Sequence, residues 1–372
     1  MLTQIKRLII FIALFFSFGA LQAQHTPENE PANTESSHKK ENGFNAGDFI
    51  IEHVSDAYDW HITSFGEKHI TIPLPVILYS KHPELHEGKT FFVFLSSKFH
   101  HGHNNYKGFR ISQSKENKGK IVEINTKGHE AGKPIDISIT KTIAGVIISV
   151  IILLWLILSV ARSSVKNKGK APSGLQNLFE PVILFIRDEV AKPAIGEKKY
   201  EKFMPFLLTL FFFILLNNLM GLIPIPPFGA NVTGNIAITM VLALFTFFIT
   251  TINGNKHYWK EIYNPDVPWW LKYPIPLMPI VELSGVITKP FVLMVRLFAN
   301  MLAGHMIVTV FVSLIFIFAG LFGAGVGLVA SPVSVAFSVF ILLLDVLVSF
   351  IQAYVFTLLS ALYFGMATSD HH

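Results

Sequence analysis

The chain has 372 residues, of which 51% are hydrophobic and only 15% are charged, and its formal net charge at pH 7 is +5. This composition argues against a soluble domain and is typical of a membrane protein. The modest basic excess lies mainly beside apolar segments, so we expect no nucleic-acid partner, and the absence of cysteine excludes disulfides and thiolate metal sites.

Residues 1–23 are expected to be a signal peptide. The basic pair Lys6 and Arg7 precedes an apolar run, and small residues precede a plausible cleavage point after Ala23. The alternative is an uncleaved membrane anchor, because Leu21 stands where a small residue is usual. Either interpretation predicts that the following residues are exported.

Residues 24–140 are expected to form an exported region, a polar linker followed by a small β-rich domain. Short β-branched and aromatic runs separated by turn residues predict the sheet: "DFIIEHV", "HITIPLPVILYS", "KTFFVFLSS" and "YKGFRIS". The cluster His100, His101 and His103 suggests a metal site, but exposed histidine clusters more often bind nothing specific. We therefore expect neither a metal nor another cofactor.

A membrane domain is expected over residues 141–372. The run "TIAGVIISVIILLWLILSVA" is long enough to cross a hydrocarbon core of ~30 Å at ~1.5 Å per residue. Basic residues follow it, which places this end in the cytoplasm. Residues 175–190 then combine apolar residues at helical spacing with charged residues elsewhere, which predicts an amphipathic helix on the membrane surface.

The remaining segments complete the predicted topology. Residues 203–255 contain no charged residue but are interrupted by "GLIPIPPFGANVTGN", which predicts two spans joined by an external loop. The segments after Pro279 are too long for upright spans, since over 40 residues of helix extend ~60 Å. We predict an all-α membrane protein with five transmembrane crossings, one interfacial amphipathic helix and a long, steeply tilted last pair. The amino end lies outside and the carboxyl end in the cytoplasm.

One permanent cation, Arg296, stands inside this long apolar region. No Asp, Glu, Lys or Arg occurs from residue 297 to residue 344. A charge at the membrane centre costs roughly 2.5 to 3.5 kcal/mol on insertion scales, so such residues are usually functional. One interpretation is a structural ion pair between Arg296 and Asp345, although buried pairs stabilise poorly after desolvation. On a helix, Glu282 and Asn300 lie near Arg296, whereas His305 points to nearly the opposite face.

The motif "KPFVLMVRLFANMLAGHMIV" resembles the signature helix of subunit a of F-type ATP synthases, and "IVELSGVITKP", "LLNNLMGLIPIP" and "FIQAYVFTLLSALYFGMA" are similar to other parts of that family. The resemblance covers residues 142–372. It implies a non-catalytic stator subunit of a bacterial inner membrane, with two offset half-channels through which ions reach the rotating c-ring. The implied partners are the c-ring, the subunit b peripheral stalk, the rest of the F1F0 complex and the lipid bilayer.

The resemblance also implies roles for individual residues. Arg296 matches the essential arginine that faces the rotor carboxylate, Asn300 the asparagine one turn beyond it, and Gln352 the glutamine that approaches the arginine. An arginine suits this position because it lowers the pKa of a nearby carboxylate and keeps its own proton, which a desolvated lysine would lose.

Two further positions depart from some bacterial members. His305 stands where those members have Glu, and Asp345 where they have His, which resembles the paired exchange of mitochondrial members. Glu282 matches a further acidic position of the aqueous route. Weaker candidates for its lining are Asn217, Asn218 and Asn235.

Two alternatives stay open at this point. A secondary transporter would usually show repeated halves, and none is evident. A structural membrane scaffold with an exported β domain would make the polar pattern from Arg296 to Gln352 a coincidence. The sequence contains no G-x-x-x-x-G-K-[ST] loop, so nucleotide chemistry is expected on other chains. It leaves proton and sodium as alternative ions.

Overall fold

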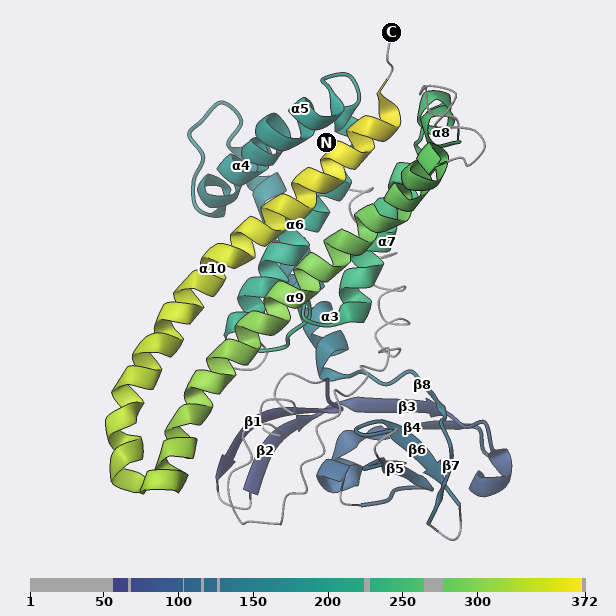
Figure 1. Cartoon of the computed structure of the whole chain (residues 1–372), viewed down its shortest axis with the longest axis vertical. Helices are drawn as coiled ribbons and strands as arrows, with labels where there is room; N and C mark the ends of the chain where they lie inside the picture. The colour runs from purple at the N-terminus through teal and green to yellow at the C-terminus, as the bar shows by residue number, and fades with distance from the viewer. Residues whose placement is uncertain are drawn as a thin grey trace.

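The computed structural model describes residues 56–65, 68–102, 104–114, 117–125, 128–223, 228–263 and 277–369. A β-rich region comes first in the chain and a bundle of helices follows it (Figure 1). The predicted signal peptide, the predicted linker and the predicted strand "DFIIEHV" lie outside the described residues. So do His103 and the side chain of His101, and the expectation for the histidine cluster therefore stays a prediction.

The described part of the β region forms three small antiparallel sheets. The first pairs β1 (Asp59–Phe65) with β2 (Lys68–Pro73). The second has the order β4 (Phe91–Leu95), β3 (Pro75–Tyr79), β8 (Ile135–Asp136), and the third has the order β5 (Phe109–Ile111), β6 (Ile121–Ile124), β7 (Glu130–Gly132). Val76, Leu78 and Phe94 from the second sheet pack with Phe109 and Ile121 from the third, so these two sheets share one apolar core.

The predicted run "HITIPLPVILYS" divides into two strands of different sheets. Pro73 ends β2 and Pro75 begins β3, with Leu74 between them. Proline has no N–H to donate to a ladder, so a pair of prolines interrupts pairing and lets the chain change sheets. The expected strands in "KTFFVFLSS" and "YKGFRIS" are β4 and β5, whereas β1, β6, β7 and β8 were not predicted.

The β region is fastened to the first long helix, α3 (Lys141–Lys166). Thr140 caps the start of α3 by accepting a hydrogen bond from the Ile143 N–H. Asp56 Oδ1 accepts a hydrogen bond of 3.0 Å from the Thr142 N–H, and the Ala57 carbonyl accepts one of 2.8 Å from the Lys141 N–H. These contacts satisfy N–H groups that a helix start leaves without partners.

In the described part of the chain, five helical segments and one π-helical turn lie between α3 and the last two helices. They are α4 (Leu175–Phe185), the π-turn η3 (Ile186–Ala191), α5 (Lys192–Ile195), α6 (Tyr200–Leu222), α7 (Ile236–Ile252) and α8 (Lys256–Tyr263). The predicted amphipathic helix over 175–190 forms as α4 and most of η3. Leu207, Phe211 and Ile214 of α6 are completely buried, so α6 lies at the centre of the bundle.

The last two helices form a long antiparallel hairpin. α9 (Leu277–Phe322) has 46 residues and α10 (Ala324–Thr368) has 45, and Gly323 alone links them with φ +91°. Figure 1 shows this hairpin running obliquely across α3, α6 and α7. Among the described residues, four helices are long and apolar enough to cross a membrane, or five spans if α7 and α8, bent by 105°, count as one. The chain is therefore a multi-pass membrane protein.

The carboxyl end of α10 is held by two other segments. The Thr368 carbonyl accepts hydrogen bonds from Lys199 Nζ at 2.7 Å and Asn255 Nδ2 at 3.1 Å, and the Ala367 carbonyl accepts one from the Asn255 N–H at 2.9 Å. These are among the carbonyls that a helix end leaves without intrahelical partners. The lysine also opposes the negative end of the helix dipole. The last turn of α10 is thus fixed to the segments before α6 and before α8.

Candidate functional site

Arg296 lies on the uncovered side of α9. Leu293 and Leu297 on the same turns are completely buried, whereas Arg296 is exposed. Both Arg296 and Asp345 are described, and no salt bridge joins them, so the structural ion pair considered from the sequence is not formed. Among the described residues no other carboxylate pairs with Arg296 either.

Asn300 and Gln352 connect the two helices of the hairpin. Asn300 Nδ2 donates a hydrogen bond of 3.0 Å to Gln352 Oε1, one turn beyond Arg296. Gln352 is buried, and its Nε2 donates to no described group. The structure therefore brings together two of the residues singled out from the sequence, with the Gln352 amide held next to the turn that carries Arg296.

His305 of α9 and Asp345 of α10 lie at the same level of the hairpin, on different sides of α9. A Cβ on Gly221 of α6 would lie 3.1 Å from His305 Nε2, so the imidazole faces α6. A Cβ on Gly304 would lie 2.9 Å from both carboxylate oxygens of Asp345, so this carboxylate lies against the α9 backbone beside His305. Two glycines thus provide the space for the imidazole and the carboxylate. Asp345 Oδ2 is buried and accepts no hydrogen bond from the described residues.

The three asparagines named as weaker candidates have different surroundings. Asn235 caps α7 by accepting a hydrogen bond of 3.0 Å from the Ala237 N–H, which is a structural role. Asn218 accepts a hydrogen bond of 2.6 Å from Thr233, and Asn217 donates one of 2.8 Å to the Phe213 carbonyl of its own helix. Asn217 and Asn218 are buried within one turn of Gly221, on the helix that faces His305.

Glu282 lies far from the His305 region. The two are 23 residues apart on one continuous helix, which is about 34 Å of length. Glu282 is only partly buried near the start of α9. Glu282 therefore lies toward the opposite end of α9 from His305.

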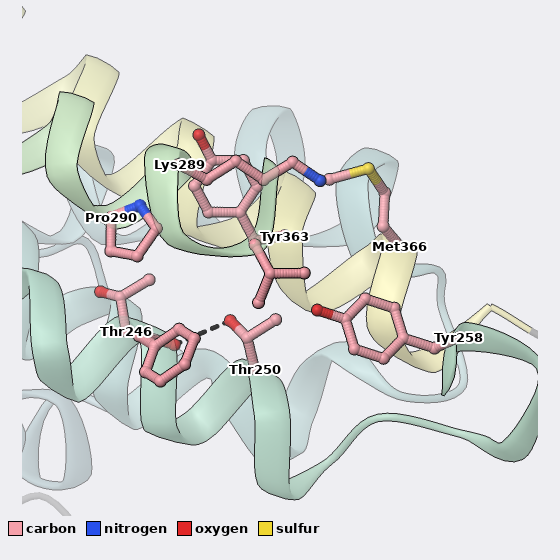
Figure 2. A pocket seen from close by; sticks show the side chains of 9 residues that line it. Thr246, Thr250, Tyr258, Lys289, Pro290, Tyr363 and Met366 are labelled. Carbon is pink, nitrogen blue, oxygen red and sulfur yellow. Dashed lines mark hydrogen bonds between the residues drawn. The ribbon is translucent and has the colours of Figure 1, made fainter. Parts of the chain in front are cut away.

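A hollow opens near that end, where α7, α8, α9 and α10 meet. Figure 2 shows its lining, which includes Lys289 from α9, Tyr363 from α10, Tyr258 from α8 and the pair Thr246 and Thr250 from α7. Lys289 Nζ lies 5.7 Å from the centre of the Tyr363 ring. The hollow thus places polar groups of four helices on the amino-terminal side of Arg296.

The sequence reasoning did not identify the residues of this hollow. Tyr363 had a detectable signal, because it stands eleven residues after Gln352, about three helical turns, and so shares its side of α10. Thr246 and Thr250 gave no such signal in the sequence. Threonines are common in helices, where the hydroxyl bonds the carbonyl one turn earlier, as Thr250 does to Thr246.

The family model for the ATP synthase A chain matches residues 143–365, a range that contains Arg296, Asn300, His305, Asp345 and Gln352. The chain belongs to this family. It is therefore a non-catalytic, ion-translocating stator subunit of the F0 sector, as the resemblance implied, and the remainder of the F1F0 ATP synthase is its partner. This family assignment overturns the secondary transporter and the structural scaffold as alternatives.

Curated relatives agree with this assignment. The chain is 45% identical over 248 residues to ATP synthase subunit a 2 of Chlorobaculum tepidum, which covers 64% of this chain and 66% of the relative. It is 45% identical over 245 residues to ATP synthase subunit a of Chloroherpeton thalassium, with 63% and 69% covered. For ATP synthase subunit a of Myxococcus xanthus the identity is 41% over 245 residues, with 64% and 75% covered. A separate model, a domain of unknown function (DUF8433), matches residues 49–138.

Proposed function

We propose that protons enter and leave the c-ring through two offset half-channels that are separated by Arg296. The position of Arg296 carries this proposal, because it is exposed on α9 between two polar regions. Lys289 and the hollow lie seven residues before it, about 10 Å along the helix, and His305 lies nine residues after it, about 14 Å. A proton can then reach the ring at one depth and leave it at another.

Arg296 supplies the electrostatic step. A cation near the rotor carboxylate favours its ionised state, so the carboxylate releases its proton before it passes the arginine. Arg296 has no carboxylate partner among the described residues, which leaves its guanidinium available to the rotor. The fixed charge also prevents a direct leak between the half-channels. Each proton gains ~2.3 kcal/mol per 100 mV, and this free energy turns the ring only if the leak is closed.

We assign His305 and Asp345 to the external half-channel, with Asn300, Gln352 and one or both of Asn217 and Asn218 beside them. The orphaned Asp345 Oδ2 supports this, because a buried carboxyl oxygen without a partner costs free energy and is seldom kept without a function. Glu282 and the hollow then form the cytoplasmic half-channel. Proton rather than sodium is the ion we propose.

The proposed setting follows the charge pattern of the loops. We propose five crossings, of which α7 is the third, with α8 and its Lys256, Lys260 and Glu261 in the cytoplasmic loop that follows. The α9–α10 pair is steeply tilted, and α4 lies on the membrane surface. The β region, residues 24–140, lies outside a bacterial inner membrane after an amino-terminal signal peptide of residues 1–23, and the membrane domain, 141–372, ends in the cytoplasm. The c-ring and the peripheral-stalk subunit b are the contacts that we propose within the complex.

Replacement of Arg296 by alanine tests the mechanism. The complex is expected to assemble and to copurify with the c-ring, whereas ATP-driven pumping and ATP synthesis are lost. Inverted vesicles should leak protons under an imposed potential, and the leak should require the rotor carboxylate. The matched control is Arg162→Ala at the exposed end of α3, which should pump normally. ATP synthesis by Arg296→Ala at the control rate would contradict the proposal.

A further inference from the structure

The second sheet of the β region leaves one apolar face uncovered. Its inner face, with Val76 and Leu78, is part of the core. Its outer face carries six side chains that are between 45% and 61% exposed: Tyr79, Phe91, Val93, Leu95, Ile135 and Ile137. Strand pairing makes this face continuous, because Tyr79 lies opposite both Phe91 and Ile135. Single exposed apolar residues are ordinary, but a contiguous apolar face of this size indicates a docking surface.

The outer face continues directly into the contact with the membrane helices. Ladder-like pairing extends past β8, since the Ile137 N–H donates to the Ile77 carbonyl at 2.9 Å and the Ile139 N–H to the Pro75 carbonyl at 3.0 Å. Side chains two residues apart share a face of a strand, so Ile135, Ile137 and Ile139 point the same way. Ile139 packs against a core cluster that joins residues of the helix bundle to Trp60 and Leu74 of the β region. Figure 1 shows β3 and β8 on the side of the β region that faces the helices, so we take the outer face to lie on that side.

The distance from this face to the bilayer is limited by the chain itself. Ile137 precedes the first residue of α3 by four positions, which spans at most about 14 Å even when fully extended. Figure 1 shows β3 running sideways from the foot of α3, across the direction of the helix. The outer face thus extends beyond the bundle at the level where α3 leaves the membrane.

Basic residues edge the outer face at one end. Tyr79, Phe91 and Ile135 form one row across the three strands. Two residues further along each strand, at the same end of the sheet, stand the exposed side chains of Lys81, Lys89 and Lys133. Two glutamates, Glu84 and Glu87, lie in the turn between Lys81 and Lys89. An apolar surface flanked by lysines is typical of a site that meets the phosphate layer of a membrane, because lysines can reach the headgroups while apolar neighbours enter the acyl boundary.

We propose that the outer face rests on the bilayer surface at the end of α3 and inserts Phe91, Val93 and Leu95 at the headgroup boundary. The bilayer is the favoured occupant because α3 crosses it and the short tether keeps the face beside it, without any further binding partner. The proposal concerns the β region alone and does not depend on the roles assigned to Arg296, His305 or Asp345.

Cysteine labelling tests this proposal, since the chain has no cysteine of its own. Val93→Cys and, as a control, Lys118→Cys in the exposed β5–β6 turn are each labelled with an environment-sensitive fluorophore. The full chain is measured in vesicles, both alone and within the assembled ATP synthase. Quenching is measured with nitroxides attached to phospholipid headgroups and acyl chains, and separately with aqueous iodide.

The probe at residue 93 is expected to show severalfold stronger quenching by the lipid nitroxides and severalfold weaker quenching by iodide than the probe at residue 118, alone and in the complex. Equal iodide quenching at both positions would mean that the outer face is open to water and would overturn the proposal. Protection from iodide without lipid quenching would also overturn it, because a protein segment or another subunit would then cover the face.

Discussion

Replacement of Gly304 by alanine probes the external half-channel through a single methyl group. The new Cβ would lie 2.9 Å from each Asp345 oxygen, whereas ordinary contacts begin near 3.4 Å, so the carboxylate or the helices must move by about 0.5 Å. Overpacking costs roughly 1 to 3 kcal/mol, and exchanging glycine for alanine inside a helix returns about 1 kcal/mol. The stability change is therefore small, and the complex should assemble.

Proton transfer is expected to suffer more than stability, because a displacement of about 1 Å at a reacting group can cost on the order of a hundredfold in rate. For half that displacement we expect ATP-driven proton pumping in inverted vesicles to slow by about tenfold. Gly320→Ala is the matched control on the same helix, since nothing lies within 4 Å of its Cβ. Pumping by Gly304→Ala at the rate of Gly320→Ala, with unchanged melting temperatures, would refute the placement of Asp345 in the pathway.

Three further predictions address other parts of the chain. The double exchange His305→Glu with Asp345→His should retain more ATP-driven pumping than either single change, and a double variant no better than the worse single would show that the two do not act as a pair. Deletion of residues 26–138 should leave an inserted complex that pumps, because the pathway residues all lie after this range; loss of pumping in a normally assembled complex would contradict this. Hydrogen bonds from Ser112 and neighbouring side chains hold the pKa of Glu130 below its ordinary value, so its contribution to stability is present above pH ~4.5 and is lost as the pH falls through the lowered pKa. Glu130→Gln should therefore lower the melting temperature of the β region at pH 7 and flatten its decline toward acid, as followed by circular dichroism, and an unchanged pH profile would argue against this carboxylate.

The sequence predicted the membrane helices well because their signal is strong and local. The mainly apolar segment after Pro279 predicted a helix too long for an upright span, and α9 has 46 residues. The family motif then selected Arg296, Asn300 and Gln352, and the structure brings Asn300 and Gln352 into contact. Residues three or four apart on a helix share a face, so the position of Asn300 beside Arg296 could be found without coordinates.

The parts that sequence reasoning missed depend on contacts between distant segments. Gly221 and Gly304 are ordinary small residues until the structure shows which side chains approach them, His305 from α9 and Asp345 from α10. The π-turn η3 likewise had no local signal, because its extra residue is decided by how this segment packs against the bundle. The short strands β6, β7 and β8 are too brief for a periodic pattern to indicate them.

The fastening of the last turn of α10 has a mechanical consequence. The hairpin is secured at the Thr368 end. Its opposite end, the turn between α9 and α10, projects away from the other helices (Figure 1). It therefore behaves as a cantilever, in which a sideways push deflects the tip most and the anchored part least. Gln352 lies sixteen residues from the anchor and twenty-nine from the tip, so a load from a turning neighbour bends the far half before it disturbs the bond to Asn300.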